Sequence, residues 1–370
     1  MTLVAGSYEK FIWGFSLKTQ KDQETQEKPV QALKPLFSYP SHNTCIKSVA
    51  VSGSVAVSGG ADDTIKIYDL HTCSEVGTLV VHNGAVNALS FYNLPSSPVS
   101  LPCNLLSGAD DGTVCIYDTN PFVHLKSIVA HKRGVNDLAI HPSGRLALSV
   151  GRDSCLAMLN LVRGRRSFCC RLGGEAMIVR YDTEGGKFFM ATEEKVSVHN
   201  SEDARLVFEM ESQKRILCAV PSENKLLFTS GEDRCITAWD ITSGTVAYSI
   251  DSAHSARVKG LVVLGTRHGN NTSDSPFLLA SASSDGVIRV WDVRMAKKDK
   301  PTPLAEASTK SRLTCLAGSS IKSLIDEKTN PNPLMIFKHV ILESLLQVYE
   351  LGLPYNVVFA SFLGSKQSVA

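Results

Sequence analysis

Residues 105–118 have the sequence LLSGADDGTVCIYD, and this stretch decides the fold. Two leucines lead into a tight turn at 110–112, where Asp-Asp-Gly supplies residues that tolerate a positive φ. After the turn, apolar side chains alternate with Thr113 and Cys115, which is the period of two that is typical of a β-strand. The stretch therefore predicts two antiparallel strands joined by a hairpin.

The same pattern recurs along the chain. Clear copies are VSGGADDTIKIYD at 57–69, LFTSGEDRCITAWD at 227–240 and ASASSDGVIRVWD at 280–292, with weaker copies from Leu148 and Phe189. The aligned turn aspartates are Asp62, Asp111, Asp153, Asp233 and Asp285. Their spacing fits a repeat of about 40–45 residues with loop insertions. A repeat of this length that ends in Trp-Asp or Tyr-Asp indicates an all-β, WD-repeat β-propeller.

We expect seven blades of four strands each. Complete blades begin at Ile46 and continue to about Ala307, with Pro- and Ser-rich insertions as surface loops. The fourth blade, at 176–210, is degenerate because it lacks the turn aspartate and the aromatic residue after it.

The two ends of the propeller complete one blade between them. Residues 2–17 resemble two strands of a blade without its inner strand, 18–28 a loop, and 36–39 the outer edge strand. Residues 312–317 resemble an inner strand without partners. Pairing these ends closes the ring, which matters because an open propeller exposes two sheet edges with unpaired backbone groups. The predicted propeller domain covers residues 1–318.

Polar residues take fixed places in the better repeats. A His precedes the inner strand, a Ser lies four residues before the turn Asp, and an aromatic residue lies six after it. The sets are His42, Ser58, Asp62 and Tyr68; His82, Ser107, Asp111 and Tyr117; His131, Ser149 and Asp153; and His254, Ser281, Asp285 and Trp291. The third set has Leu159 in the aromatic place. Because these groups lie in a largely buried sheet, we expect them to bond to one another.

Ser, His and Asp are also the residues of a hydrolase triad. A triad needs one nucleophile beside one oxyanion hole, whereas this set recurs from blade to blade. The sequence contains no G-x-S-x-G elbow and no Walker loop. We therefore interpret the sets as a structural network and expect neither an enzyme nor a cofactor.

Composition sets further bounds. The chain has 370 residues, 43% of them hydrophobic, and a formal net charge of +2, which suits a globular fold and gives no general argument for nucleic-acid binding. The ten cysteines form no C-x-x-C pair and no zinc-spaced His/Cys cluster, so we expect free thiols in a reducing compartment and no metal. The opening MTLVAGSYEKFIWGF lacks the pattern of a signal peptide.

Four segments carry a resemblance to a known family. They are LVAGSYEKFIWGF, AHKRGVNDLAIHPSGRLALSVGRD, SASSDGVIRVWDV and SRLTCLA, which begin at Leu3, Ala130, Ser281 and Ser311. Together they resemble the PAK-interacting protein 1-like family of eukaryotic WD-repeat proteins, and this chain is similar to a plant member. The resemblance covers about residues 1–318.

The resemblance implies a non-enzymatic scaffold of the nucleus and nucleolus. Members act in large (60S) ribosomal subunit biogenesis and pre-rRNA maturation on pre-ribosomal particles. The animal member is also a binder and negative regulator of PAK-type kinases, which Rho-family GTPases activate. The implied partners are proteins of the pre-large-subunit particle, pre-rRNA and a PAK-type kinase, with this chain as a monomer within the larger assembly.

The end of the chain departs from the family pattern, in which a lysine-rich tail follows the last inner strand. Residues 319–370 are instead largely apolar, and 334–351 are compatible with a helix. Charge interrupts this run at Lys338, His339, Glu343 and Glu350, and Pro354 ends it, so we expect no membrane span. We interpret the tail as an alternative or mis-spliced C-terminus without the basic residues that would support nucleolar targeting or RNA contact.

Local basic clusters are the candidate partner-binding residues. Arg163, Arg165 and Arg166 lie together in LVRGRRSF, and further clusters are Lys132-Arg133 and Lys297, Lys298 and Lys300. These can meet pre-ribosomal RNA or acidic partners, and the alternative is a solvated polar rim.

A second hypothesis comes from the end of the repeat at 279–294. Its sequence Trp291-Asp292-Val293-Arg294 resembles the box by which some propellers dock on the adaptor of a cullin-RING ubiquitin ligase, with Arg294 as the critical contact. This pattern overlaps heavily with an ordinary repeat. The alternative function is therefore that of a substrate receptor of such a ligase.

Overall fold

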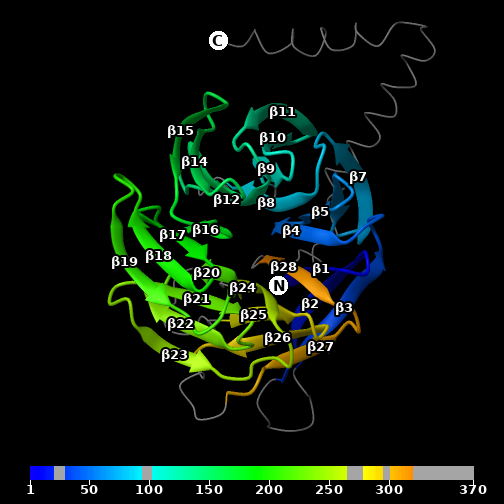
Figure 1. The fold of residues 1–370 in the computed structure, drawn as a ribbon. Helices are drawn as coiled ribbons and strands as arrows, with labels where there is room; N and C mark the ends of the chain where they lie inside the picture. Colours follow the sequence, from blue (N-terminus) through cyan, green and yellow to red (C-terminus); the bar gives the residue numbers. More distant parts are fainter. Residues whose placement is uncertain (21–29, 94–101, 265–277, 295–300, 320–370) are drawn as a thin grey trace, which may run out of the picture. The chain divides into compact units, whose positions relative to one another are not determined.

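Seven four-stranded antiparallel sheets surround a common centre in the computed structural model (Figure 1). The structure describes residues 1–20, 30–93, 102–264, 278–294 and 301–319. The predicted tail helix at 334–351 lies outside these residues. In each sheet an end strand, called the inner strand, faces the centre, and the other three strands follow outward. The all-β, seven-bladed propeller predicted from the repeats is confirmed.

The first three blades follow one another in the chain. Blade one consists of β4 (Ile46–Ser52), β5 (Val55–Gly60), β6 (Thr64–Asp69) and β7 (Ser74–Val80). Blade two consists of β8 (Val86–Tyr92), β9 (Asn104–Ala109), β10 (Thr113–Thr119) and β11 (Phe122–Val129). Blade three consists of β12 (Val135–Ile140), β13 (Leu146–Gly151), β14 (Cys155–Asn160) and β15 (Arg165–Arg171).

The remaining blades repeat this order. Blade four consists of β16 (Ile178–Tyr181), β17 (Lys187–Thr192), β18 (Lys195–Asn200) and β19 (Leu206–Glu211). Blade five consists of β20 (Ile216–Pro221), β21 (Leu226–Gly231), β22 (Ile236–Asp240) and β23 (Val246–Ile250). Blade six consists of β24 (Val258–Leu264), β25 (Leu278–Ser283), β26 (Val287–Asp292) and β27 (Ala305–Ser308). Blade seven consists of β28 (Leu313–Ser319), β1 (Thr2–Ser7), β2 (Phe11–Gln20) and β3 (Val30–Pro40).

Blade seven joins the two ends of the propeller. Strand β28 pairs with β1, so that Leu3 lies opposite Gly318 and Ala5 opposite Leu316. Beside this ladder the Tyr8 N–H donates to the Arg312 carbonyl (2.8 Å). The predicted closure by pairing of N- and C-terminal strands is confirmed. Strand β1 is paired on both sides, with β28 and with β2, and β28 is the inner strand of this blade.

The predicted loop at 18–28 is wrong for its first residues. Strand β2 extends through Gln20, where Lys18 pairs with Ala32 and Gln20 with Val30. Polar side chains gave no strand periodicity here, but the pairing is made by the backbone and needs none. Residues 21–29 lie outside the described part of the chain.

Apolar clusters fill the space between neighbouring blades. Alternate strand residues face the next sheet, as in any stacked pair of sheets. Between blades six and seven, Leu3 and Leu316 pack with Leu264 and Leu278. Between blades seven and one, the buried residues include Val4, Ile12, Ile46 and Tyr68. Each blade is therefore held mainly by its two neighbours.

Inner strands are also linked by hydrogen bonds from side chains near their beginnings. In each case the side chain donates to the carbonyl of a residue in or just before the next inner strand. The bonds are Ser48 Oγ to Val86 (3.0 Å), Asn87 Nδ2 to Val135 (2.8 Å), Asn136 Nδ2 to Ala176 (2.9 Å) and Thr314 Oγ1 to Ile46 (2.7 Å). Asn87, Asn136 and Thr314 occupy β-bulges, which turn their side chains toward the next blade.

We expect Leu3→Ala to lower the free energy of unfolding by about 2–5 kcal/mol, because it leaves a cavity where β1 completes the core of blades six and seven. Urea denaturation at neutral pH measures this loss. The matched control is Leu304→Ala, since Leu304 is 37% exposed and its truncation should cost little. Equal losses for the two variants would contradict the role given to β1.

Candidate functional site

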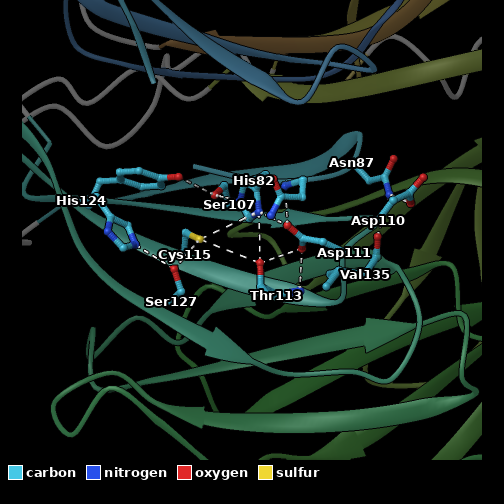
Figure 2. A network of polar contacts seen from close by, with 12 residues as sticks. His82, Asn87, Ser107, Asp110, Asp111, Thr113, Cys115, His124, Ser127 and Val135 are labelled. Carbon is cyan, nitrogen blue, oxygen red and sulfur yellow. Dashed lines mark hydrogen bonds and ion pairs between the residues drawn. The ribbon is translucent and has the colours of Figure 1, made fainter. Parts of the chain in front are cut away.

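His82 lies at the centre of a polar network in blade two (Figure 2). Its Nε2 is 2.6 Å from Ser107 Oγ, and its Nδ1 is 3.0 Å from a carboxylate oxygen of Asp111. Asp111 also accepts hydrogen bonds from the N–H groups of Asn83 (3.0 Å) and Thr113 (2.8 Å). The network therefore ties the loop before β8 to the turn between β9 and β10.

The turn depends on Gly112, which has φ of 79°. A Cβ built at this position would lie 2.5 Å from the carbonyl oxygen of His131, at the start of the next blade. Both the backbone conformation and the close approach therefore require glycine.

The three other predicted sets have the same geometry. In blade one, His42 lies 2.9 Å from Asp62 and 2.7 Å from Ser58. In blade three, His131 lies 2.9 Å from both Asp153 and Ser149. In blade six, His254 lies 3.3 Å from Asp285 and 2.8 Å from Ser281.

The aromatic member differs from set to set. The hydroxyl of Tyr68 lies 2.8 Å from Ser58 Oγ, and Trp291 Nε1 donates to Ser281 Oγ at 2.9 Å. Tyr117 is more distant, with its hydroxyl 3.5 Å from Ser107 Oγ. Leu159, in the set around His131, is buried and has no polar atom to offer.

These sets resemble a catalytic triad in atom order but not in access. Ser58, Ser107, Ser149 and Ser281 are each 0% exposed. A nucleophile must reach a substrate carbonyl beside an oxyanion hole, and a fully buried hydroxyl cannot. The Ser–His–Asp geometry in these blades therefore serves to satisfy buried polar groups.

The network shifts the ionisation of its members. Burial alone would raise the pKa of Asp111, but hydrogen bonds from Thr113, Asn83 and His82 outweigh it and the pKa is lowered. Burial also lowers the pKa values of His42 and His254.

His82 differs in direction from those two histidines. Burial would lower its pKa, but Cys115, whose Sγ lies 3.9 Å from Nδ1, and Asp111 together raise it.

Blade five carries a partial network that the sequence prediction missed. Trp239 Nε1 donates to Thr229 Oγ1 (2.8 Å), and Asp233 occupies the turn. Ser212 stands where the complete sets have His, and burial raises the pKa of Asp233. The signal was available, because Thr229 lies four residues before Asp233 and Trp239 six after it.

The predicted partner-binding arginines of blade three lie at its outer edge. Arg163 and Arg165 are exposed at the beginning of β15, and Arg171 is exposed on the same strand at its other end. Lys126 of β11 lies beside this edge, since a Cβ on Gly164 would be 3.2 Å from its Cγ. Within the described ranges, none of these four basic side chains forms an ion pair. We call Lys126, Arg163, Arg165 and Arg171 the basic edge.

Other predicted basic residues are already engaged or lie elsewhere. Arg166 Nη1 donates to the carbonyl of Ala130 (2.7 Å), so that this side chain supports the loop before His131. Lys132 and Arg133 are exposed in the same loop. Lys297, Lys298 and Lys300 fall outside the described residues.

Arg294 makes a bidentate contact within its own chain. Its Nε lies 3.0 Å from Asp292 Oδ1 and its Nη2 lies 2.8 Å from Asp292 Oδ2. A docking partner that used this guanidinium would have to share it with Asp292.

A pocket of about 270 Å³ lies against the inner strands of blades two, three and four. Its lining is mixed, with apolar side chains beside hydroxyl, guanidinium and carboxylate groups, and consists of Leu89, Ser90, Leu138, Ala139, Ile140, Arg180, Tyr181 and Asp182. Arg180 is paired with Asp137, a carboxylate whose pKa is raised by burial. The described part of the chain contains neither a group of three or more potential metal ligands nor a helix long and apolar enough to cross a membrane.

Comparisons with known proteins agree with this geometry. The family described as WD domain, G-beta repeat matches residues 33–69, 73–118, 122–158 and 248–292. Each matched segment contains one complete His–Ser–Asp set, except that the third has no aromatic member. Blades four and five, which lack such sets, are not matched.

Whole-chain relatives extend the similarity to most of the protein. A p21-activated protein kinase-interacting protein 1-like of Danio rerio is 32% identical over 85% of this chain and 79% of that protein. The p21-activated protein kinase-interacting protein 1 of Homo sapiens is 37% identical over 90% and 80%, respectively. Shk1 kinase-binding protein 15 of Schizosaccharomyces pombe is 25% identical over 79% and 77%.

We expect Asp111→Ala to lower the free energy of unfolding by about 1–3 kcal/mol, because it leaves His82 and two backbone N–H groups without their acceptor. Asp233→Ala is the matched control at the same turn position, and it should cost less because Ser212 stands in the histidine place of that blade and no described histidine bonds to Asp233. Urea denaturation compares the two. A larger loss for Asp233→Ala would contradict the network.

The stabilising effect of Asp111 should depend on pH. Its pKa in the folded protein is lowered below the ordinary value for an aspartate, so its contribution is present above that ordinary value and is lost as the pH falls through the folded pKa. The difference in unfolding free energy between the wild type and Asp111→Asn should therefore shrink between pH 5 and pH 3. Denaturation curves at several pH values measure it, and a constant difference would be inconsistent with the lowered pKa.

Proposed function

The chain belongs to the p21-activated protein kinase-interacting protein 1 family of WD-repeat proteins, and from this premise we propose that it is a non-enzymatic scaffold in nucleolar large (60S) ribosomal subunit biogenesis and pre-rRNA maturation. In this proposal it acts in the nucleus and nucleolus, as a monomer within a pre-ribosomal particle. The observation that carries the proposal is the similarity itself, which covers 85–90% of the chain.

The architecture supports a binding role over a catalytic one. The repeated Ser–His–Asp sets are buried and used internally, so they leave the faces and rim of the propeller for contact with other molecules. A rigid ring held by strand pairing presents its loops at fixed positions, which suits the assembly of several partners on one scaffold.

The basic edge is the part of the described surface that suits pre-rRNA. Its four positive charges come from adjacent blades and have no ion-pair partner among the described residues, so phosphates can neutralise them and release counterions. Phe168 lies on the same strand and is 54% exposed, which places an aromatic ring where a base can stack.

A second candidate function is the binding and negative regulation of a PAK-type kinase. The names of the animal relatives specify interaction with p21-activated protein kinase, and the name of the fission-yeast relative specifies binding of Shk1 kinase. This role is compatible with the first, because a propeller has enough separate surface for more than one partner.

Affinity purification of the tagged full-length protein tests both functions. We expect recovery of large-subunit precursors with their pre-rRNA, and a PAK-type kinase as a second partner. Recovery of only ubiquitin-ligase components, lost in Arg294→Ala, would instead establish the alternative of a cullin-RING substrate receptor.

The double variant Arg163→Glu/Arg165→Glu should lower the recovered pre-rRNA about tenfold, since it replaces two phosphate-binding charges by repulsive ones. The matched control is Arg205→Glu/Lys225→Glu, which makes the same change of net charge at exposed sites on blades four and five. Equal losses in the two double variants would show that the basic edge has no special part in RNA binding.

A further inference from the structure

The residue just before an inner strand is held in the same way in six blades. Its carbonyl accepts a hydrogen bond from the first N–H of the hairpin turn in that blade. The pairs are Cys45 with Ala61 (3.0 Å), Ala85 with Asp110 (2.9 Å), Gly134 with Arg152 (2.9 Å), Arg215 with Glu232 (3.1 Å), Arg257 with Ser284 (3.0 Å) and Arg312 with Tyr8 (2.8 Å). This position therefore carries arginine in three consecutive blades, five, six and seven.

Only one of these three arginines is neutralised within the described part of the chain. Arg312 Nε lies 2.9 Å from Glu9 Oε1, and its guanidinium lies 4.3 Å from the ring centroid of Tyr8. Arg215 and Arg257 are exposed and form no ion pair with any described residue. Blades five and six thus present, at two fixed backbone positions, guanidinium groups without an ion-pair partner in the described part of the chain.

Lys259 adds a third charge beside these two. It occupies the bulge of β24, where the corresponding Asn87, Asn136 and Thr314 hydrogen-bond to the next blade. Lys259 is half-buried and makes no such bond to a described residue. Burial, together with the neighbouring positive charges of Arg257 and Arg215, lowers its pKa. A partly desolvated ammonium beside two guanidinium groups is an arrangement that an anion would stabilise.

The surroundings limit the kind of anion. Glu232 and Asp233 lie in the turn of blade five, where the Glu232 N–H donates to the Arg215 carbonyl (3.1 Å) and the Glu232 carboxylate acts on Lys259, and neither acid forms an ion pair with the three basic residues in the described part of the chain. These acids would repel a continuous polyanion such as RNA, whose binding depends on many neutralised phosphates along a path. They would tolerate one or two carboxylates on an otherwise neutral segment, and guanidinium forks bind carboxylates in a bidentate manner.

We propose that Arg215, Arg257 and Lys259 form a carboxylate-binding site for an acidic peptide segment of a partner protein. The segment would cross the beginnings of β20 and β24 and place an Asp or Glu side chain between the two arginines and over the lysine. This site is separate from the basic edge of blade three, and it does not depend on the ribosomal or kinase role.

Fluorescence anisotropy with the full-length protein tests the site. The probes are a labelled Gly/Ser dodecapeptide with two central Glu residues, the same peptide with Gln, and a labelled dodecauridine RNA. We expect the Glu peptide to bind at least about tenfold more tightly than the Gln peptide, with Lys259→Met and Arg257→Ala each weakening it about tenfold. The matched control is Lys47→Met, which changes the exposed lysine at the equivalent bulge of blade one and should leave binding unchanged.

Thermal unfolding of the same variants separates a binding role from a structural one. Lys259→Met should keep or raise the Tm, since it removes a desolvated charge. A lower Tm would assign Lys259 to an internal contact and overturn the proposal. If Lys47→Met weakened binding of the Glu peptide equally, the binding would be general electrostatic attraction and the proposal would be wrong. If the RNA bound more tightly than the Glu peptide, the site would be one for nucleic acid, which would also overturn the proposal.

Discussion

The fold depends on the backbone ladder between β1 and β28, which joins residues from opposite ends of the propeller. Without it, two sheet edges would be unpaired, and the apolar clusters on both sides of blade seven would lose Leu3 and Val4. Every other blade is made of consecutive strands and is stabilised by its neighbours. The ladder therefore turns a row of similar sheets into a closed ring in which each inner strand has a fixed position.

Within that ring, buried polar groups set the positions of the loops. In four blades one imidazole connects a strand serine to a turn aspartate, so the loop before the blade and the hairpin inside it cannot move independently. Blades four, five and seven lack this connection. The propeller backbone is thus regular, whereas its internal hydrogen bonding differs from blade to blade. Arg215 and Lys259, which form no ion pair with a described residue, lie in and beside blade five, where the set is incomplete.

The sequence predicted what is local and repeated. Turn residues such as Asp111-Gly112 specify a hairpin by their own conformational preferences, and the fixed spacing of His, Ser and Asp indicated which groups meet. It did not predict the strand pairing of Lys18 with Ala32, because backbone pairing there leaves no side-chain pattern. Nor did it predict that Arg166 reaches Ala130, because such a contact depends on how chain segments distant in sequence are placed in three dimensions.

The contact between Glu9 and Arg312 spans 303 positions of the chain, and this has a consequence for biosynthesis. At a translation rate of about 5–20 residues per second, β1 emerges roughly 15–60 s before its partner β28. During that interval β1 can pair with β2, but the edge that β28 will cover is open to other polypeptide strands. The last strand to leave the ribosome therefore removes an edge that has been exposed since the beginning of synthesis.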